Sequence, residues 1–564
     1  MMKKNIKIGF TIFLTVFTIS QGFTQDQWEE AAGDLNDARL LIEKESVLEL
    51  PTKSKQLDKM QKIERERSAG TQEYDATPLL LSLPGIMPEL EAAELRRQSD
   101  QFVQPYNGYI KGGLGNFFTT YLEGYYYGGQ EGLFEYGVNA KHLASMRGPK
   151  DGENSANSHN SIGLSGKYAI TQGILQGNIG FERDVMHFYG YDSIPLAAEF
   201  DLDNIKQAYN VFDIGASFMN DDPLADILFE TGFDFYTLSD NYDATETNLD
   251  LHGKGKYELN DEAFVEVNTN LIFASKNDSV RVNRNLFLLG GAYYHKFDDL
   301  SIKAGFRIAY NGDDTFAESQ FRIYPDIHAK YSLVDEKVAV YGRLAGNLEQ
   351  VTLRSLSREN PFINANIPLA HTDRQIEFAA GVETAPNSKL GFKAEAGYSS
   401  VKNLFYFTNN ETDRARFDVF YEGNAEGVLN LKVEASADIG PVRAIFKTNF
   451  FNYNTDSLAE PFHRPNLLNT LAVGYNHRDK LFLNLDLYHI SGLQAREPET
   501  GITTDLDDII DLNIKADYII NDKISAFLAI NNIISNEYQR FLYYDNKGIN
   551  VLLGATYRLS SFGL

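Results

Sequence analysis

Apolar and polar residues alternate along most of this 564-residue chain, and the alternation is clearest near its C-terminal end. It runs through residues 507–522, 523–538 and 550–559, where charged or amide side chains fill the positions between apolar ones. A period of two residues is that of a β-strand with one apolar and one polar face. These runs are longer than a soluble sandwich needs, so they predict strands that cross a membrane in a closed sheet.

The same pattern recurs upstream, for example in residues 265–273, 300–308 and 481–487. Nearly every predicted strand is built alike, with lipid expected on one face and water or protein on the other. We therefore predict an all-β fold, a single transmembrane antiparallel β-barrel formed by residues 105–564. Charged residues on the polar faces are predicted to line its lumen: Lys303, Arg307, Lys393, Glu395, Asp511 and Lys515.

Short polar connections separate the predicted strands, and their number sets the size of the barrel. Ten such turns on one side imply about 22 strands, with both termini facing the periplasm. One turn contains Gly128 and Gly129, and the others span residues 170–175, 220–226, 259–264, 297–301, 334–338, 384–390, 438–443, 476–481 and 520–525. Longer connections fall on the extracellular side, at residues 145–160, 186–209, 350–373, 453–466 and 492–508. Recognition is expected in these longer loops.

Composition narrows the function classes. The net charge of −26 argues against a basic surface for nucleic acid. No apolar run approaches the roughly 20 residues of a spanning helix, so strands must cross the membrane. The 32 Tyr and 38 Phe suit the aromatic girdles of a barrel, and runs such as 125–127 and 405–407 are predicted to lie there. The absence of cysteine excludes disulfides and a lipid-anchored processed N-terminus.

The N-terminus reads as an export signal followed by a short segment. Lys3, Lys4 and Lys7 precede an apolar stretch, which predicts a cleaved signal peptide over residues 1–25 and an outer-membrane location in a Gram-negative bacterium. Residues 26–104 are predicted to be partly helical or disordered. An empty barrel of this size would abolish the permeability barrier, so this segment or infolded loops must fill it. One hypothesis is a lumen constriction formed by Leu79, Leu80, Leu81, Leu83 and Met87; the alternative is a disordered periplasmic tether.

Three motifs carry a family resemblance. The sequence INNIISNEY at 530–538 resembles the penultimate strand of TonB-dependent outer-membrane receptors, and GATYR at 554–558 resembles their final strand. Asn360, Pro361 and Phe362 stand before a polar loop, as in that family. The resemblance covers about residues 105–559 and implies the barrel half of such a receptor. The family usually ends on an aromatic residue, whereas this chain continues through 560–564.

The front of the chain departs further from that family. In that family a globular plug normally carries the TonB-contacting box. In this chain only the short, charged segment 26–104 stands at that position. The chain therefore resembles plug-less, receptor-like barrels of Bacteroidetes-type bacteria. TonB contact and energised uptake are not carried over with this resemblance.

Two functions of different classes stay open. The first is a barrel that binds a solute or moves it across the outer membrane, which predicts conductance once the occluding piece is removed. The second is a non-conducting scaffold subunit of an outer-membrane assembly or secretion complex, which predicts a periplasmic or surface lipoprotein partner. Outer-membrane lipid surrounds the barrel in both. The solute is not readable from the sequence.

Enzymatic and metal chemistry have weak support. His489 and Ser491 stand two apart near a strand end, where a lipid hydrolase would need the imidazole to reach the hydroxyl. Two residues alone do not make a catalytic site, so we expect no enzyme, no catalytic residue and no cofactor. His159, His187 and His371 lack zinc-ligand spacing, and acidic pairs such as Asp313 with Asp314 are interpreted as solvated rather than as calcium ligands. We therefore expect no metal site.

Overall fold

A computed structural model describes residues 106–560 except 131, 192–201, 221–224, 226, 315–320, 335–336 and 385–388. The predicted signal peptide, the segment 26–104 and the constriction at Leu79, Leu80, Leu81, Leu83 and Met87 all lie outside the described residues.

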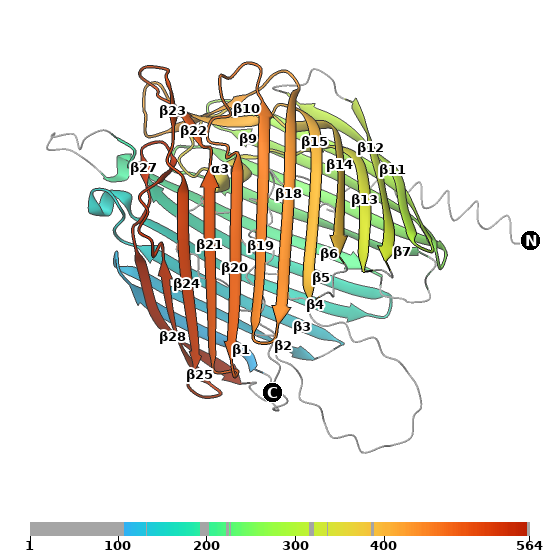
Figure 1. Ribbon diagram of the computed structural model, residues 1–564, viewed down its shortest axis with the longest axis horizontal. Coiled ribbons are helices and arrows are strands. Elements are labelled where there is room, and N and C mark those ends of the chain that lie inside the picture. Colours follow the sequence, from blue (N-terminus) through green and yellow to red (C-terminus); the bar gives the residue numbers. More distant parts are fainter. Residues whose placement is uncertain are drawn as a thin grey trace, which may run out of the picture.

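Twenty-two antiparallel strands form one closed barrel (Figure 1). Each strand pairs with the next one in the barrel, and the first pairs with the last through nine residue pairs. The predicted fold class and strand number are therefore confirmed. The barrel strands are β1 (Tyr106–Gly115), β2 (Thr119–Gln130), β3 (Phe134–Ser145), β4 (Asn157–Ile170), β5 (Gly173–His187), β6 (Lys206–Met219), β7 (Ile227–Ser239), β8 (Thr245–Asn260), β9 (Ala263–Asn277), β10 (Arg281–Phe297), β11 (Leu300–Asp313), β12 (Phe321–Val334), β13 (Val338–Glu349), β14 (Thr372–Thr384), β15 (Leu390–Lys402), β18 (Glu426–Ile439), β19 (Val442–Asn454), β20 (Leu467–His477), β21 (Leu481–Ser491), β24 (Ile509–Ile519), β25 (Ile524–Asn531) and β28 (Asn550–Ser560).

The two faces of the wall differ in the way the alternation predicts. On β11, Phe306 is 47% exposed while Lys303, three residues before it, is 6% exposed. Successive side chains of a strand point to opposite faces, so the exposed apolar residues form the outer surface and the polar ones face inward. An exposed apolar exterior is stabilised by contact with lipid, and the closed sheet allows the backbone groups of neighbouring strands to pair without water. Among the described residues, none of the helices has both the length and the apolar character to cross a membrane.

Ten short connections lie at one end of the barrel, close to the predicted positions. The first turn was placed slightly early, since Gly128 and Gly129 still belong to β2. The strand predicted over residues 523–538 was too long, because β25 ends at Asn531. Asn532 and Ser535 have φ angles of 48° and 54°, a left-handed conformation that ends the strand although apolar residues continue.

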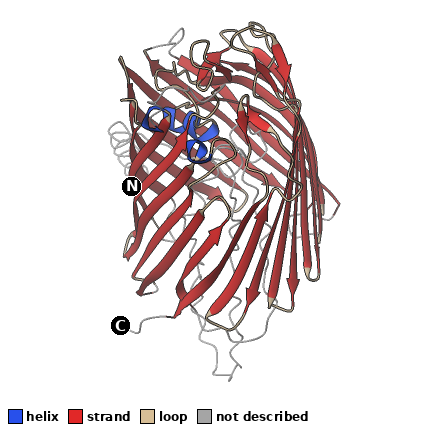
Figure 2. Ribbon diagram, turned by 90° about the vertical axis from the view of Figure 1, so that its left-hand side faces the viewer, coloured by secondary structure: helices blue, strands red, loops and turns tan. Residues whose placement is uncertain are grey.

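The opposite, extracellular end carries the longer connections. They hold the helix α3 (Leu353–Glu359), the 3-10 turns η2 (Gly152–Ser155) and η3 (Leu202–Asn204), and three small hairpins. The hairpin strands are β16 (Phe405–Asn409), β17 (Phe417–Tyr421), β22 (Gln494–Arg496), β23 (Thr503–Asp505), β26 (Gln539–Phe541) and β27 (Tyr544–Asp545). Figure 2 shows the helical turns near the upper end of the barrel. Two of these connections, residues 403–425 and 532–549, were not predicted as long loops.

Candidate functional site

Several long connections pack together and against the inner wall at the extracellular end. We call them the cap, and define it as residues 188–191, 350–371, 403–425, 455–466 and 532–549. Residues 188–191, 350–371, 403–425 and 532–549 share one apolar core with wall residues of β5, β6 and β7. Residues 455–466 reach this core through the ring of His463, which contacts Phe417 and Phe541. The infolded loops considered from the sequence as a filling of the barrel are therefore present at this end.

The helix α3 is held at its N-terminus by a carboxylate of the wall. Thr352 caps the helix through Ser355, whose backbone N lies 2.9 Å from the threonine hydroxyl. Glu246 on β8 accepts hydrogen bonds from the backbone N–H of Leu353 at 2.6 Å and of Arg354 at 3.2 Å. The first N–H groups of a helix have no partner within it, so Glu246 supplies one from the barrel. The carboxylate is 3% exposed, which makes this anchor a buried, charge-assisted one.

A second anchor joins α3 to β5. Arg358 donates to Glu182 at 2.7 Å, and Arg354 lies 3.8 Å from the same carboxylate. On β4, His159 lies 2.6 Å from Asp184, so the structure brings His159, Glu182 and Asp184 into one group with the spacing of metal ligands. The sequence did not predict this cluster, because its members meet only through strand pairing. Two arginines already neutralise Glu182, and we assign the group to anchoring of the cap.

Buried charges on β9, β10 and β11 hold the remainder of residues 350–371. Lys276 donates to the backbone carbonyl of Ile367 at 2.6 Å. Arg284 pairs with Asp313 at 2.8 Å and also donates to the backbone carbonyl of Val351. Asp313 is 1% exposed, so its interpretation as a solvated acid was wrong. Removal of one partner of such a buried pair leaves an uncompensated charge, and the loop is therefore fixed to the wall by interactions that are costly to break.

Aromatic rings form the centre of the cap. Phe362 stacks on Tyr544 with ring centroids 3.6 Å apart, and Tyr189 meets Tyr544 at 4.7 Å. Phe417 and Phe541 pack beside them with centroids 5.5 Å apart. All five side chains are at most 2% exposed. Full burial of such a side chain contributes roughly 1.5–3 kcal/mol, so this core binds four separate loops to one another.

Polar contacts join the remaining loops of the cap. Arg464 donates to the backbone carbonyl of Phe405 at 2.7 and 2.9 Å, and Arg540 donates to that of His463 at 2.7 Å. Glu422, fully buried, accepts from the backbone N–H of Ser457 and Leu458 at 2.9 and 2.8 Å. These contacts connect residues 403–425, 455–466 and 532–549.

Burial shifts the pKa values of several titratable groups in the cap, His463 and Glu359 among them. It lowers the pKa of His463 to about 3, with the charge of Arg540 acting in the same direction. Burial raises the pKa of Glu359, which Arg464 and Arg540 partly oppose. His463 is therefore neutral at ordinary pH.

The residues predicted to line the lumen all lie on the inward face of the wall, where each has a polar partner. Their function in a solute pathway stays a prediction. The pairs are Lys303 and Arg307 with Asp326 at 2.8 and 3.4 Å, Lys393 with Glu383 at 3.8 Å, Glu395 with Tyr341 at 2.8 Å, Asp511 with Tyr538 at 3.0 Å, and Lys515 with Asp517 at 3.4 Å.

Two other sequence interpretations concern His489 with Ser491 and the aromatic run at 405–407. His489 lies 3.0 Å from Asn469 and 3.4 Å from Asp508, and within the described residues no hydrogen bond joins it to Ser491. Tyr406 and Phe407 are at most 2% exposed and belong to the cap hairpin, so their placement in an interfacial belt was wrong. Aromatic residues inside otherwise polar loops were the available signal for the cap.

No protein-family model matches the chain, and no curated protein does. Solved structures do match. The FrpB iron transporter from Neisseria meningitidis (F5-1 variant) is 9% identical, covers 81% of this chain and 83% of its own, and has a TM-score of 0.63. The siderophore receptor PirA from Acinetobacter baumannii is 10% identical, covers 80% of each chain and has a TM-score of 0.62. The pyoverdine receptor FpvA from Pseudomonas aeruginosa PAO1 is 13% identical, covers 82% of this chain and 80% of its own, and has a TM-score of 0.60.

These similarities concern the fold. Together with the closed 22-stranded sheet and its exposed apolar exterior, they identify the chain as an outer-membrane β-barrel of a Gram-negative bacterium that resembles TonB-dependent receptors. The similar proteins are named as an iron transporter and as siderophore and pyoverdine receptors. They give no support to the scaffold alternative.

Proposed function

We propose that the chain is a receptor-type transport barrel of the outer membrane, whose extracellular mouth is closed by the cap until a solute is admitted. The observation that carries the proposal is the way the cap is attached. Its loops are held to the wall by Glu246, Glu182 and Arg284, and breaking a buried charged contact of this kind is costly. A surface loop that only closed a hairpin would need none of them.

The inward face below the cap supports a polar pathway. Charged side chains such as Lys303, Glu395 and Asp511 stand on the lumen side of strands spread around the barrel. We infer that these residues, with Arg307, Lys393 and Lys515, line the route of a hydrophilic solute. The similar structures are named for iron transport and siderophore binding, which favours import over assembly as the role of this chain.

The front of the chain completes the proposal. Residues 1–25 act as an export signal, and residues 26–104 take the place of a plug, with Leu79, Leu80, Leu81, Leu83 and Met87 as the lumen constriction. This is the plug-less, Bacteroidetes-type arrangement that the chain resembles because only the short, charged segment 26–104 stands where the family has its plug. TonB contact is not assumed, and neither a lipoprotein partner nor a particular solute is part of the proposal.

Conductance in planar bilayers tests this function. We compare the full chain with a variant in which residues 353–369 are replaced by a short Gly/Ser linker, a variant that lacks residues 25–99, and a variant with both changes. Both single changes should raise single-channel conductance, and the double variant should conduct most. A Gly/Ser replacement of residues 499–501, the exposed tip between β22 and β23, serves as the control and should match the full chain. A folded double variant that does not conduct would refute transport and favour a scaffold.

A further inference from the structure

A continuous row of four polar side chains lies on the outer face of β3, β4, β5 and β6, and we call it the outer row. Its members are His142, Asn160, Arg183 and Asn210. Each member is paired directly with the next one across neighbouring strands. Directly opposed residues of a sheet point to the same face. Glu182 points inward to the cap, so its neighbour Arg183 and the whole row point outward.

The outer row stands at the upper edge of the apolar belt. Each member is three or four residues from the extracellular end of its strand. Two residues further toward the periplasm, the same face carries Ile162, Phe181 and Phe212, which are 52%, 42% and 38% exposed. The polar row therefore lies where the acyl chains of the membrane meet the lipid headgroups.

The amide groups of the row hold its cation in place. Arg183 donates through Nη1 to the amide oxygen of Asn210. The Nδ1 atom of His142 lies 2.6 Å from the amide oxygen of Asn160, and its Nε2 atom lies 2.9 Å from the Thr120 hydroxyl. Asn160 thus uses its oxygen within the row. Its NH₂ group lies across the strand pair from Arg183, and both groups can donate to one ligand.

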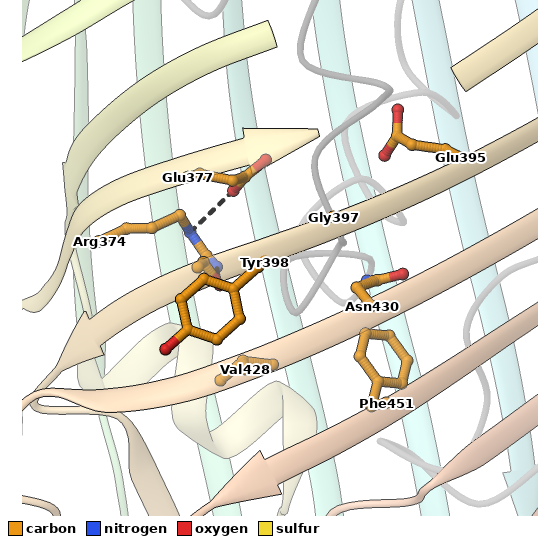
Figure 3. A pocket seen from close by; sticks show the side chains of 9 residues that line it. Arg374, Glu377, Glu395, Gly397, Tyr398, Val428, Asn430 and Phe451 are labelled. Atoms are coloured by element: carbon orange, nitrogen blue, oxygen red, sulfur yellow. Dashed lines mark hydrogen bonds and ion pairs between the residues drawn. The ribbon is translucent and has the colours of Figure 1, made fainter. Parts of the chain in front are cut away.

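The charge of Arg183 has no counter-ion in the part of the chain that the structure describes. An inward arginine of the wall is different, as Arg374 on β14 shows, because it lies 3.0 Å from Glu349 and 3.7 Å from Glu377 (Figure 3). A guanidinium has five N–H donors, so Arg183 keeps donors beyond the one that binds Asn210. A cation at the edge of the hydrocarbon is stabilised by an anion of the lipid headgroups.

The connections beside the row have the same amphiphilic character. Arg147, two residues beyond the end of β3, lies over the ring of Phe118 at 4.9 Å from its centroid. Phe118 and Met146 are 61% and 60% exposed. Exposed apolar side chains next to a cation can contact acyl chains while the cation meets a headgroup.

We propose that the outer row binds the phosphorylated sugar headgroup of a glycolipid in the outer leaflet of the membrane. The phosphate oxygens accept from the guanidinium of Arg183 and from the NH₂ group of Asn160. The row extends over three strand spacings, roughly 14 Å, so it is longer than a single phosphate. The hydroxyl groups of the sugar bind the other members of the row, and the acyl chains lie on Ile162, Phe181 and Phe212.

Titration of the full chain in detergent with diphosphoryl lipid A tests the inference, with Kd measured by native mass spectrometry. The same lipid without its phosphates should bind at least about tenfold more weakly, because the charge-assisted hydrogen bonds are lost. Arg183→Gln should weaken binding of diphosphoryl lipid A by about tenfold, and Asn160→Leu by about fivefold.

Lys402→Gln is the matched control. Lys402 follows the fully buried Val401 at the extracellular end of β15, so it also faces outward, but β15 lies far from the outer row around the barrel. This variant should stay within about twofold of the wild type.

Heat-modifiable migration in electrophoresis shows whether each variant is folded, and the phosphate-free lipid needs no variant at all. Equal binding of the lipid with and without its phosphates, or unchanged binding by folded Arg183→Gln, would overturn the inference. An equally large loss in Lys402→Gln would also overturn it, since any outward cation would then suffice. Equal binding of phosphatidylglycerol would refute the glycolipid as the occupant. The site lies on the outside of the barrel, so none of these results depends on conductance.

Discussion

Replacement of Glu246 by glutamine should loosen the cap at helix α3 without disturbing the barrel. One carboxylate oxygen accepts from the Leu353 N–H at 2.6 Å, and the other accepts from the Arg354 N–H at 3.2 Å and the Tyr236 hydroxyl at 2.8 Å. Glutamine keeps one acceptor oxygen and presents an NH₂ group at the other position. The Leu353 N–H then loses its partner and faces a second donor in a buried site.

The magnitude follows from these contacts. A hydrogen bond to a charged group contributes about 1.5–3 kcal/mol, and the two bonds that remain become neutral and weaker. We expect a local loss of about 2–3 kcal/mol, which corresponds to about 30- to 150-fold more frequent opening of α3, since 1.4 kcal/mol is a factor of ten. The strands of the wall should keep their protection.

Hydrogen–deuterium exchange of residues 353–359 in detergent measures this opening. Glu258→Gln is the control, because Glu258 lies on the same strand but is exposed, and its ion pair in the described part of the chain is with Lys256 at 2.7 Å. The reasoning is refuted if residues 353–359 exchange in Glu246→Gln within about threefold of the wild-type rate, or if Glu258→Gln accelerates them equally.

Three further predictions address other parts of the cap. Asp313→Asn should cost about 3–5 kcal/mol because Arg284 is left buried without its counter-charge; the melting temperature of the heat-modifiable band should fall, and an unchanged temperature would contradict the anchor. Phe362→Ala should cost about 3–5 kcal/mol of cap stability and speed tryptic cleavage at Arg414 and Arg416, and wild-type cleavage rates would show that the ring core is not needed. The buried His463 stays neutral in the folded cap, with its pKa lowered to about 3, so the unfolded cap binds a proton first and stability should fall as pH drops from about 6.5 toward 3. Glu359, whose pKa is raised in the folded cap, stabilises the cap as pH drops and so opposes this effect. The test therefore compares how the guanidinium midpoint of unfolding changes between pH 7, 6 and 5 in the wild type and in His463→Gln. An equal change of the midpoint with pH in the two proteins would exclude His463 as the source.

The barrel could be predicted from the sequence because its rule is local. Side chains of a strand between lipid and lumen must alternate between apolar and polar, as Phe306 and Lys303 show. Each polar turn marks a reversal of the chain direction, so the number of turns predicts the number of strands. The rule misled where apolar residues continue past the end of the strand, beyond Asn531, because the left-handed conformation of Asn532 ends β25.

The cap could not be predicted in the same way. Its contacts join residues far apart in the chain, such as Tyr189 with Tyr544 and Arg358 with Glu182, and no local period records them. Single features were visible, among them Phe362 after Asn360 and Pro361 and the aromatic run at 405–407. The sequence does not show that these residues pack against the barrel wall, so it is equally compatible with a position at the membrane interface or with a family motif.

The central claim is that the cap loops are folded into the barrel mouth, and labelling of a buried cap position in intact cells tests it most directly. The chain contains no cysteine, so Ala370→Cys places a single thiol at a fully buried position of residues 350–371, and Ile502→Cys places one at a position that is 63% exposed. With a membrane-impermeant maleimide added from outside, Ile502→Cys should react within minutes, whereas Ala370→Cys should stay unlabelled until the protein is denatured. Equally fast labelling of the two cysteines would contradict a closed cap.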